Sequence, residues 1–144
     1  MVWEEVTGRW NAQQASAMYA GPIRRALQRT RPGKRSWLIM EDNDPAGYKS
    51  NQAKETKRSH HMRTLNQPPY SPDLNPLDFS IWHAIETRAS KGSPRGRETT
   101  DAFKSRLRRI AMRLPRREVR KAVVAIRKRA DAIFKAKGKH IRMD

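Results

Sequence analysis

The sequence predicts an α/β fold in the first part of the chain and basic helices in the second. Short apolar runs alternate with segments of helical periodicity over residues 1–90, and two amphipathic, arginine-rich segments follow. The 144 residues have the length of one ordinary domain, which excludes an enzyme with a separate cofactor domain. We expect an α/β domain over residues 1–90, a linker over residues 91–97 and a basic helical extension over residues 98–144.

The first elements expected are a short strand and a long helix. Residues 2–6 are the strand candidate, and Thr7-Gly8 ends it. Asn11 is a suitable N-cap for a helix over residues 12–28. Gly21-Pro22 is expected to interrupt or kink that helix, because proline lacks the backbone N–H that a helix interior uses.

A second group of short elements follows. The apolar run 37–40 is typical of a buried strand, residues 46–60 can form an exposed helix, and residues 62–65 are a further strand candidate. Residues 67–72 contain three prolines and must form an extended loop, since each proline disfavours helix in the residue before it. The next helix is expected to start near Asn75-Pro76.

Two basic helices are expected at the C-terminal end, over residues 100–114 and 116–137. Pro115 separates them and Gly138 ends the second. Their polar faces carry the side chains that we assign to nucleic-acid phosphates, namely Lys104, Arg106, Arg108, Arg109, Arg113, Arg116, Arg117, Arg120, Lys121, Arg127 and Lys128.

The formal net charge is +18, from 32 basic and 14 acidic residues. Residues 1–80 carry 12 basic and 8 acidic residues (net +4), and residues 81–144 carry 20 and 6 (net +14). Such an excess indicates a polyanionic partner, with nucleic acid the commonest and an anionic membrane surface second. The alternative is a set of solvated helix faces. We favour binding to nucleic-acid phosphates without sequence specificity.

Several classes of protein are excluded by composition. There is no cysteine, so disulfides, thiolate metal sites and thiol nucleophiles are absent. No apolar run approaches the roughly 18 residues of a membrane helix, and Glu4 and Glu5 stand where a secretory signal carries basic residues. We expect an intracellular protein with no membrane partner.

Two groups of acidic residues stand out. One directly follows the strand predicted at residues 37–40, and the other lies where the helix after the proline-rich loop begins. Asp42 and Asp44 could be Asx-turn residues before Pro45. Asp73 could be a turn or cap residue, and Asp78 could simply interact with a helix N-terminus. Spacing alone leaves these structural readings open beside a catalytic one.

Together, the two acidic segments resemble the DDE endonuclease domain of mariner-type (Tc/mariner) transposases. In that family a strand ends in Asp-Asn-X-Pro, which here is residues 42–45. The more specific string is Ser-Pro-Asp-Leu-Asn-Pro at residues 71–76, followed by Asp78 and the aromatic Trp82. The 35 residues between Asp42 and Asp78 lie within the family's usual range.

This resemblance implies a ribonuclease-H-like fold, a mixed sheet flanked by helices. It also implies DNA strand cleavage and joining by Mg²⁺ or Mn²⁺ ions held on three acids, since hard cations prefer carboxylate oxygens. Asp42 would be the second acid and Asp78 the third, both catalytic and metal-binding, and Asp73 and Asn75 would shape the loop. The implied partner is DNA, in the nucleus of a eukaryote and otherwise in the cytoplasm.

The family's first acid has no direct counterpart here, and Glu4 or Glu5 could substitute only if their segment occupied the place of the lost strand. That acid lies on the first strand of the sheet, upstream of the strand that residues 2–6 resemble. We therefore expect a fold truncated at its first strands, weak or absent metal binding, and a chain that does not cleave DNA alone. A second copy or another partner is expected to cover the exposed sheet. The alternative is a noncatalytic basic nucleic-acid-binding protein that reuses the fold.

Overall fold

The computed structural model describes residues 2–42, 44–92, 94, 96–139 and 141. It divides into two compact units, unit 1 (Met1–Pro69) and unit 2 (Tyr70–Asp144). This division differs from the boundary expected after residue 90. The reason is that α4 (Trp82–Lys91) packs against α5 (Thr100–Met112) within unit 2. Residues 93 and 95 of the expected linker, and Asn43 of the first acidic motif, lie outside the described residues.

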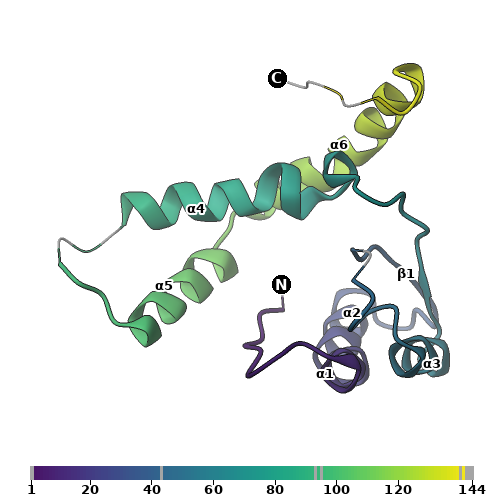
Figure 1. Ribbon diagram of the computed structural model, residues 1–144, viewed down its shortest axis with the longest axis horizontal. Helices are drawn as coiled ribbons and strands as arrows, with labels where there is room; N and C mark the ends of the chain where they lie inside the picture. Colours follow the sequence, from purple (N-terminus) through teal and green to yellow (C-terminus); the bar gives the residue numbers. More distant parts are fainter. Residues whose placement is uncertain (1, 43, 93, 95, 140, 142–144) are drawn as a thin grey trace. The chain divides into compact units, whose positions relative to one another are not determined.

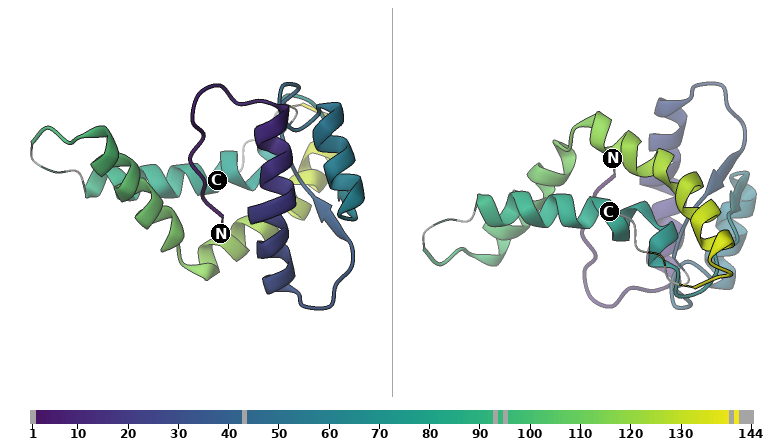
Figure 2. Two further views of the ribbon diagram at one scale, coloured as in Figure 1. Left: turned by 90° about the horizontal axis from the view of Figure 1, so that it is seen from below. Right: turned by 90° about the horizontal axis from the view of Figure 1, so that it is seen from above.

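One continuous helical segment runs over residues 12–30 of unit 1 (Figure 2). It consists of α1 (Ala12–Met18), the π-helical turn η1 (Tyr19–Ile23) and α2 (Arg24–Thr30). Asn11 caps it as expected, because its side chain accepts a hydrogen bond from Gln14 N at 3.0 Å. Pro22 lies inside η1. A wider turn accommodates a residue that has no N–H and whose ring crowds the preceding turn.

The sheet of unit 1 has two parallel strands, β1 (Trp37–Ile39) and β2 (Met62–Thr64), with Trp37 opposite Met62. The connection between them contains α3 (Asn51–Ser59), as parallel neighbours need a long crossover. Ser50 starts α3 by accepting a hydrogen bond from Ala53 N at 3.2 Å. The strands predicted at residues 37–40 and 62–65 and the helix between them are confirmed, and unit 1 is α/β.

The predicted strand over residues 2–6 is wrong. These residues have no regular secondary structure, and β1 and β2, the strands of the described chain, pair only with each other. A strand is stable when a neighbour satisfies its backbone N–H and C=O groups. Residues 2–6 have the composition of a strand but no neighbour to pair with in the described part of the chain.

The core of unit 1 lies where the first helical segment meets α3 and β2. Ala15, Tyr19, Ala53 and Met62 are buried there. Around them pack partly buried side chains: Trp10, Ile23, Leu27, Trp37, Ile39 and Tyr48. This packing holds the end of β1 against α3, where the first acidic segment begins.

Unit 2 is helical in its described part. The loop expected at the prolines leads into a 3-10 turn, η2 (Pro72–Leu74), and a π-helical turn, η3 (Leu77–Ile81), that continues into α4. The chain then reverses, α5 packs back against α4, and α6 (Arg116–Lys135) follows (Figure 1). None of the helices in the described ranges is long and apolar enough to cross a membrane.

Candidate functional site

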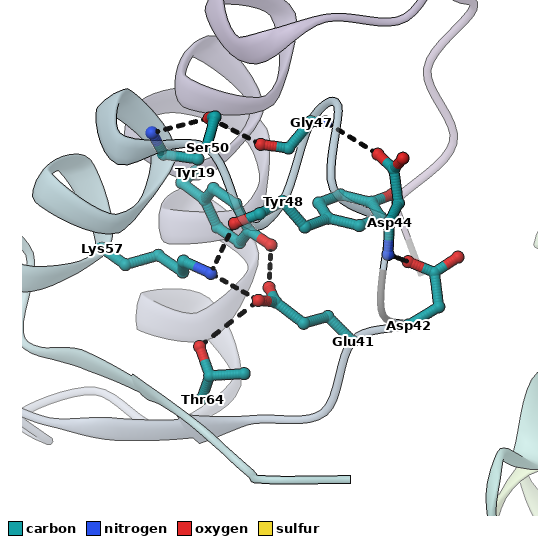
Figure 3. Close-up of polar contacts among 10 residues, drawn as sticks. Tyr19, Glu41, Asp42, Asp44, Gly47, Tyr48, Ser50, Lys57 and Thr64 are labelled. Carbon is teal, nitrogen blue, oxygen red and sulfur yellow. Dashed lines mark hydrogen bonds and ion pairs between the residues drawn. The ribbon is translucent and has the colours of Figure 1, made fainter. Parts of the chain in front are cut away.

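The first acidic segment begins with Glu41, directly after β1, and its carboxylate points into unit 1 (Figure 3). It accepts hydrogen bonds from the Tyr19 hydroxyl and the Lys57 ammonium group. Only 5% of the Lys57 side chain and 6% of the Glu41 side chain are exposed to solvent. Lys57 Nζ also donates to the Tyr48 carbonyl oxygen at 3.0 Å, so the buried cation has two partners. This ion pair fixes the residue immediately before Asp42.

The two tyrosines beside this ion pair are held neutral. Burial raises the pKa of the Tyr19 hydroxyl, and its hydrogen bond to Glu41 raises it further. Burial also raises the pKa of Tyr48, and the nearby charge of Asp42 adds to the effect. Tyr19 therefore stays a hydrogen-bond donor to the Glu41 carboxylate well above neutral pH.

Asp42 is exposed, and its carboxylate is turned away from the Glu41 cluster (Figure 3). Side chains of successive residues at the end of a strand point to opposite sides, which explains why Glu41 is buried while Asp42 faces solvent. Asp42 Oδ1 lies 3.4 Å from Asp44 N, a long contact of the Asx-turn kind. The same carboxylate remains accessible to a ligand from solvent.

Asp44 is a structural cap. Its carboxylate accepts hydrogen bonds from Trp10 Nε1 at 2.9 Å, Gly47 N at 2.8 Å and Ala46 N at 3.1 Å. Burial by itself would raise the pKa of Asp44, but these hydrogen bonds outweigh it and lower the pKa. Gly47 is required here, because an added Cβ would lie 1.9 Å from Trp10 Nε1.

Asp78 lies in the first turn of η3 in unit 2, and it is exposed. Asn75 Nδ2 donates a hydrogen bond to Asp78 Oδ2 at 2.8 Å, while Asn75 Oδ1 accepts one from Leu77 N at 3.1 Å. One asparagine thus starts the helical turn and orients the carboxylate. This is a physical reason for the Asn-Pro-X-Asp spacing.

Asp73 ties the proline-rich loop to α6. Arg129 Nη1 lies 3.6 Å from Asp73 Oδ1, and its guanidinium carbon lies 4.0 Å from the centre of the Phe79 ring. The ion pair is mostly buried, with 14% and 19% of the two side chains exposed. Asp73 therefore holds the loop in position through its ion pair with Arg129, in agreement with the role that the family resemblance implies.

The side chains assigned to phosphate binding lie on α5, on α6 and between them, and all except Arg106 are exposed. Arg106 Nη2 lies 2.6 Å from Glu98 Oε2, and Arg106 Nη1 donates to the Ala89 carbonyl oxygen at 2.6 Å. The hydrogen bond to Glu98 raises the pKa of Arg106. The same bond lowers the pKa of Glu98. The charge of Arg106 is thus already paired within unit 2.

The chain has sequence relatives among transposases of Caenorhabditis briggsae. The transposase of the transposable element Tcb1 is 29% identical over 109 residues, which cover 72% of this chain and 36% of the relative. The Tcb2 transposase is 32% identical over 76 residues, which cover 49% of this chain and 27% of the relative. No protein-family model matches the chain.

Solved structures match this chain in fold over nearly its whole length. The catalytic domain of Mos1 mariner transposase has a TM-score of 0.80 at 19% identity, covering 96% of this chain and 67% of that one. The Mos1 catalytic domain with raltegravir and Mn has a TM-score of 0.75 at 19% identity, covering 96% and 68% of the two chains. The sequence relatives of this chain are transposases of the Tc1/mariner type. The likeness to Mos1 confirms the expected fold class at the level of a ribonuclease-H-like α/β fold. The expected mixed sheet is a pair of parallel strands in the described part of the chain.

The chain spans about a third of the length of the curated transposases it matches, 36% of Tcb1 and 27% of Tcb2. Asp42 and Asp78 offer the hard oxygen ligands that Mg²⁺ and Mn²⁺ prefer. In the described ranges, no group of three or more His, Asp or Glu side chains is arranged to hold a metal ion. Each of the two carboxylates, taken by itself, has the donor chemistry that a hard divalent cation needs.

Sequence patterns did not assign a role to Glu41 or Lys57. Lys57 follows Ala53 by four residues on α3, and both are buried. A lysine on the same helix face as a buried alanine signals a buried anion nearby, because an unpaired ammonium group is costly to bury. That signal points to a partner but does not identify Glu41, which lies 16 residues away.

Proposed function

We propose that this chain is a DNA-binding domain of the transposase type whose Asp42 and Asp78 contribute carboxylates to a divalent-metal site. The observation that carries the proposal is the hydrogen bond that orients Asp78 through Asn75, in the motif that the resemblance assigns to the third acid. When bound, Mg²⁺ or Mn²⁺ would activate the attacking oxygen and stabilise the leaving oxygen at a DNA phosphodiester. Asp42 would ligate from the end of β1, a position that Glu41 fixes.

We assign DNA binding to the exposed basic side chains of α5 and α6. Contacts between arginine or lysine and phosphates give affinity that is independent of base sequence and falls steeply with salt. Asp42 and Asp78 do not contribute to this phosphate binding, because a carboxylate repels a phosphate unless a cation lies between the two groups. The proposal therefore assigns two separate roles, which we call the division of labour: the two carboxylates bind metal, and the basic helices bind the DNA backbone.

Binding of Mn²⁺, followed by electron paramagnetic resonance, tests the metal ligands. We expect Asp42→Asn and Asp78→Asn each to weaken Mn²⁺ binding, because each removes one carboxylate. Asp101→Asn, which removes an exposed carboxylate in the first turn of α5, should leave binding unchanged. Equal Mn²⁺ binding by all four proteins would contradict the assignment and favour a noncatalytic nucleic-acid-binding protein.

We further propose that this chain does not cleave DNA by itself, since two matched acids cannot supply the ligands of a two-metal site that three acids hold. Nicking of supercoiled plasmid in Mg²⁺ or Mn²⁺ tests this. We expect the same conversion with the wild-type chain and with Asp42→Ala. Metal-dependent nicking by the wild type that Asp42→Ala abolishes would refute the proposal.

A further inference from the structure

A cavity of about 320 Å³ opens in unit 1 beside Asp42. Glu41 and Asp42 line it from the end of β1, Tyr48 and Lys49 from the following turn, and Lys54 and Lys57 from α3. Its volume is at the lower end of the range of sites for small ligands. The cavity therefore has room for one phosphate group with part of its sugar.

The charges around this cavity leave a positive excess. Glu41 and Lys57 neutralise each other in the buried ion pair. Lys49 and Lys54 are exposed and form no ion pair with another residue in the described part of the chain. Two unpaired lysines and one remaining carboxylate, that of Asp42, thus line the cavity, and an anion is the ligand that this balance favours.

The backbone positions of the two lysines are well held. Lys49 N donates a hydrogen bond to the Asp44 carbonyl oxygen at 3.1 Å, and Lys54 N donates one to the Ser50 carbonyl oxygen at 3.0 Å. The Ser50 side chain caps α3 between them. The backbones of both lysines are therefore fixed, one in a turn and one in the first turns of α3, and both residues line the cavity that Asp42 also lines.

We propose that Lys49 and Lys54 hold a phosphate group of a DNA strand in this cavity, beside the Asp42 carboxylate. The inference rests on the proposed DNA-binding function and adds a contact in unit 1 to those assigned to the basic helices of unit 2. Tyr48 forms a half-buried aromatic wall against which a sugar or base can pack. The lysines would position the strand, while Asp42 would carry the metal.

The chemical test is lysine acetylation, followed by mass spectrometry, with and without a short single-stranded oligothymidylate at low salt. We expect the acetylation rates of Lys49 and Lys54 to fall several-fold on binding, and that of the exposed Lys34 in unit 1 to stay unchanged. The same experiment with inorganic phosphate at equal concentration distinguishes the source of the phosphate. Equal protection by inorganic phosphate would overturn the assignment to a DNA strand.

Matched variants provide a second readout. For Lys49→Gln/Lys54→Gln, the slope of log affinity against log salt should fall by about 1.4, since each phosphate bound in single-stranded DNA contributes about 0.7. Arg29→Gln/Lys34→Gln removes the same charge elsewhere in unit 1 and should leave the slope unchanged. Circular dichroism checks that both variants fold.

The outcomes separate this inference from the proposed function. If the oligonucleotide protects Lys121 and Lys128 on α6 but not Lys49 and Lys54, the cavity inference is overturned and DNA binding by the basic helices stands. If no lysine is protected and no binding is measured at low salt, both the inference and the proposed function fail.

Discussion

Asn75 Nδ2 donates a hydrogen bond to Asp78 Oδ2 across 2.8 Å, and the same side chain accepts one from Leu77 N. The asparagine is therefore a positioning residue for the Asp78 carboxylate. A partner that orients a ligand usually contributes tenfold or more to metal affinity. This relationship links the spacing of the motif to the chemistry assigned to it.

Replacing Asn75 separates its two roles. Asn75→Ala and Asn75→Ser both remove the amide N–H that donates to Asp78, and both should weaken Mn²⁺ binding by about tenfold. Serine can still accept a hydrogen bond at the start of a helical turn, so only the alanine variant should also lose stability. Mn²⁺ titration and urea unfolding measure the two effects. Unchanged Mn²⁺ affinity in both variants would show that Asn75 only starts the turn.

The buried ion pair of Glu41 and Lys57 should dominate the stability of unit 1. Lys57→Met leaves a buried carboxylate without its cation, which should cost about 3–5 kcal/mol in the free energy of unfolding. Glu41→Leu/Lys57→Met removes both charges and should cost less than the single change. Urea unfolding measures both.

The exposed pair of Arg58 and Glu55 is the matched control on the same helix, with 81% and 64% of the two side chains exposed. Arg58→Met should change the free energy of unfolding by less than about 1 kcal/mol. A loss in Lys57→Met no larger than that in Arg58→Met would mean that the buried pair does not stabilise the fold.

Alkaline pH should destabilise the chain through Tyr19. Its folded pKa is raised above the usual value of about 10, so the folded state retains a proton that the unfolded state loses. The stabilisation is complete below pH 10 and falls above it, by up to about 1.4 kcal/mol per pH unit for one proton. Urea unfolding as a function of pH measures the slope.

Tyr19→Phe should show a shallower loss of stability above pH 10, because phenylalanine has no proton to retain. Tyr70→Phe is the control, since Tyr70 is fully exposed at 101%. It should unfold with the wild-type pH dependence. An identical slope in Tyr19→Phe and the wild type would contradict the assigned hydrogen bond between Tyr19 and Glu41.

Gly47→Ala should disrupt the cap formed by Asp44. The added Cβ would lie 1.9 Å from Trp10 Nε1 and 2.8 Å from Asp44 Oδ2, so the indole must move and its hydrogen bond to Asp44 must break. We expect a loss of about 1–3 kcal/mol in urea unfolding.

Gly21→Ala is the matched control for that change, because its Cβ would meet its nearest neighbour, Arg25 Nη1, at an ordinary 3.5 Å. It should be neutral or stabilising by up to about 1 kcal/mol. If Gly47→Ala is as stable as Gly21→Ala, close packing of Trp10 on the turn is not what requires glycine.

Local patterns in the sequence were enough to predict the helical segment after Asn11 and the strands β1 and β2, because periodicity and capping act within a few residues. Asp78 was found through a motif in which Asn75 stands three residues away. The strand predicted at residues 2–6 was wrong because pairing depends on a neighbour that composition does not reveal. The pairing of Lys57 with Glu41 and of Arg106 with Glu98 was missed for the same reason, since each depends on how elements pack.

The most direct test of the division of labour is the salt dependence of binding to duplex DNA. In Arg108→Gln/Arg109→Gln/Arg113→Gln the slope of log affinity against log salt should fall by up to about 2.7, roughly 0.9 for each phosphate that is no longer neutralised by an arginine. Asp42→Ala/Asp78→Ala should keep the wild-type slope and bind DNA as tightly or more tightly, because it removes negative charge. Strong weakening by the aspartate changes, with the slope of the arginine variant unchanged, would contradict the account.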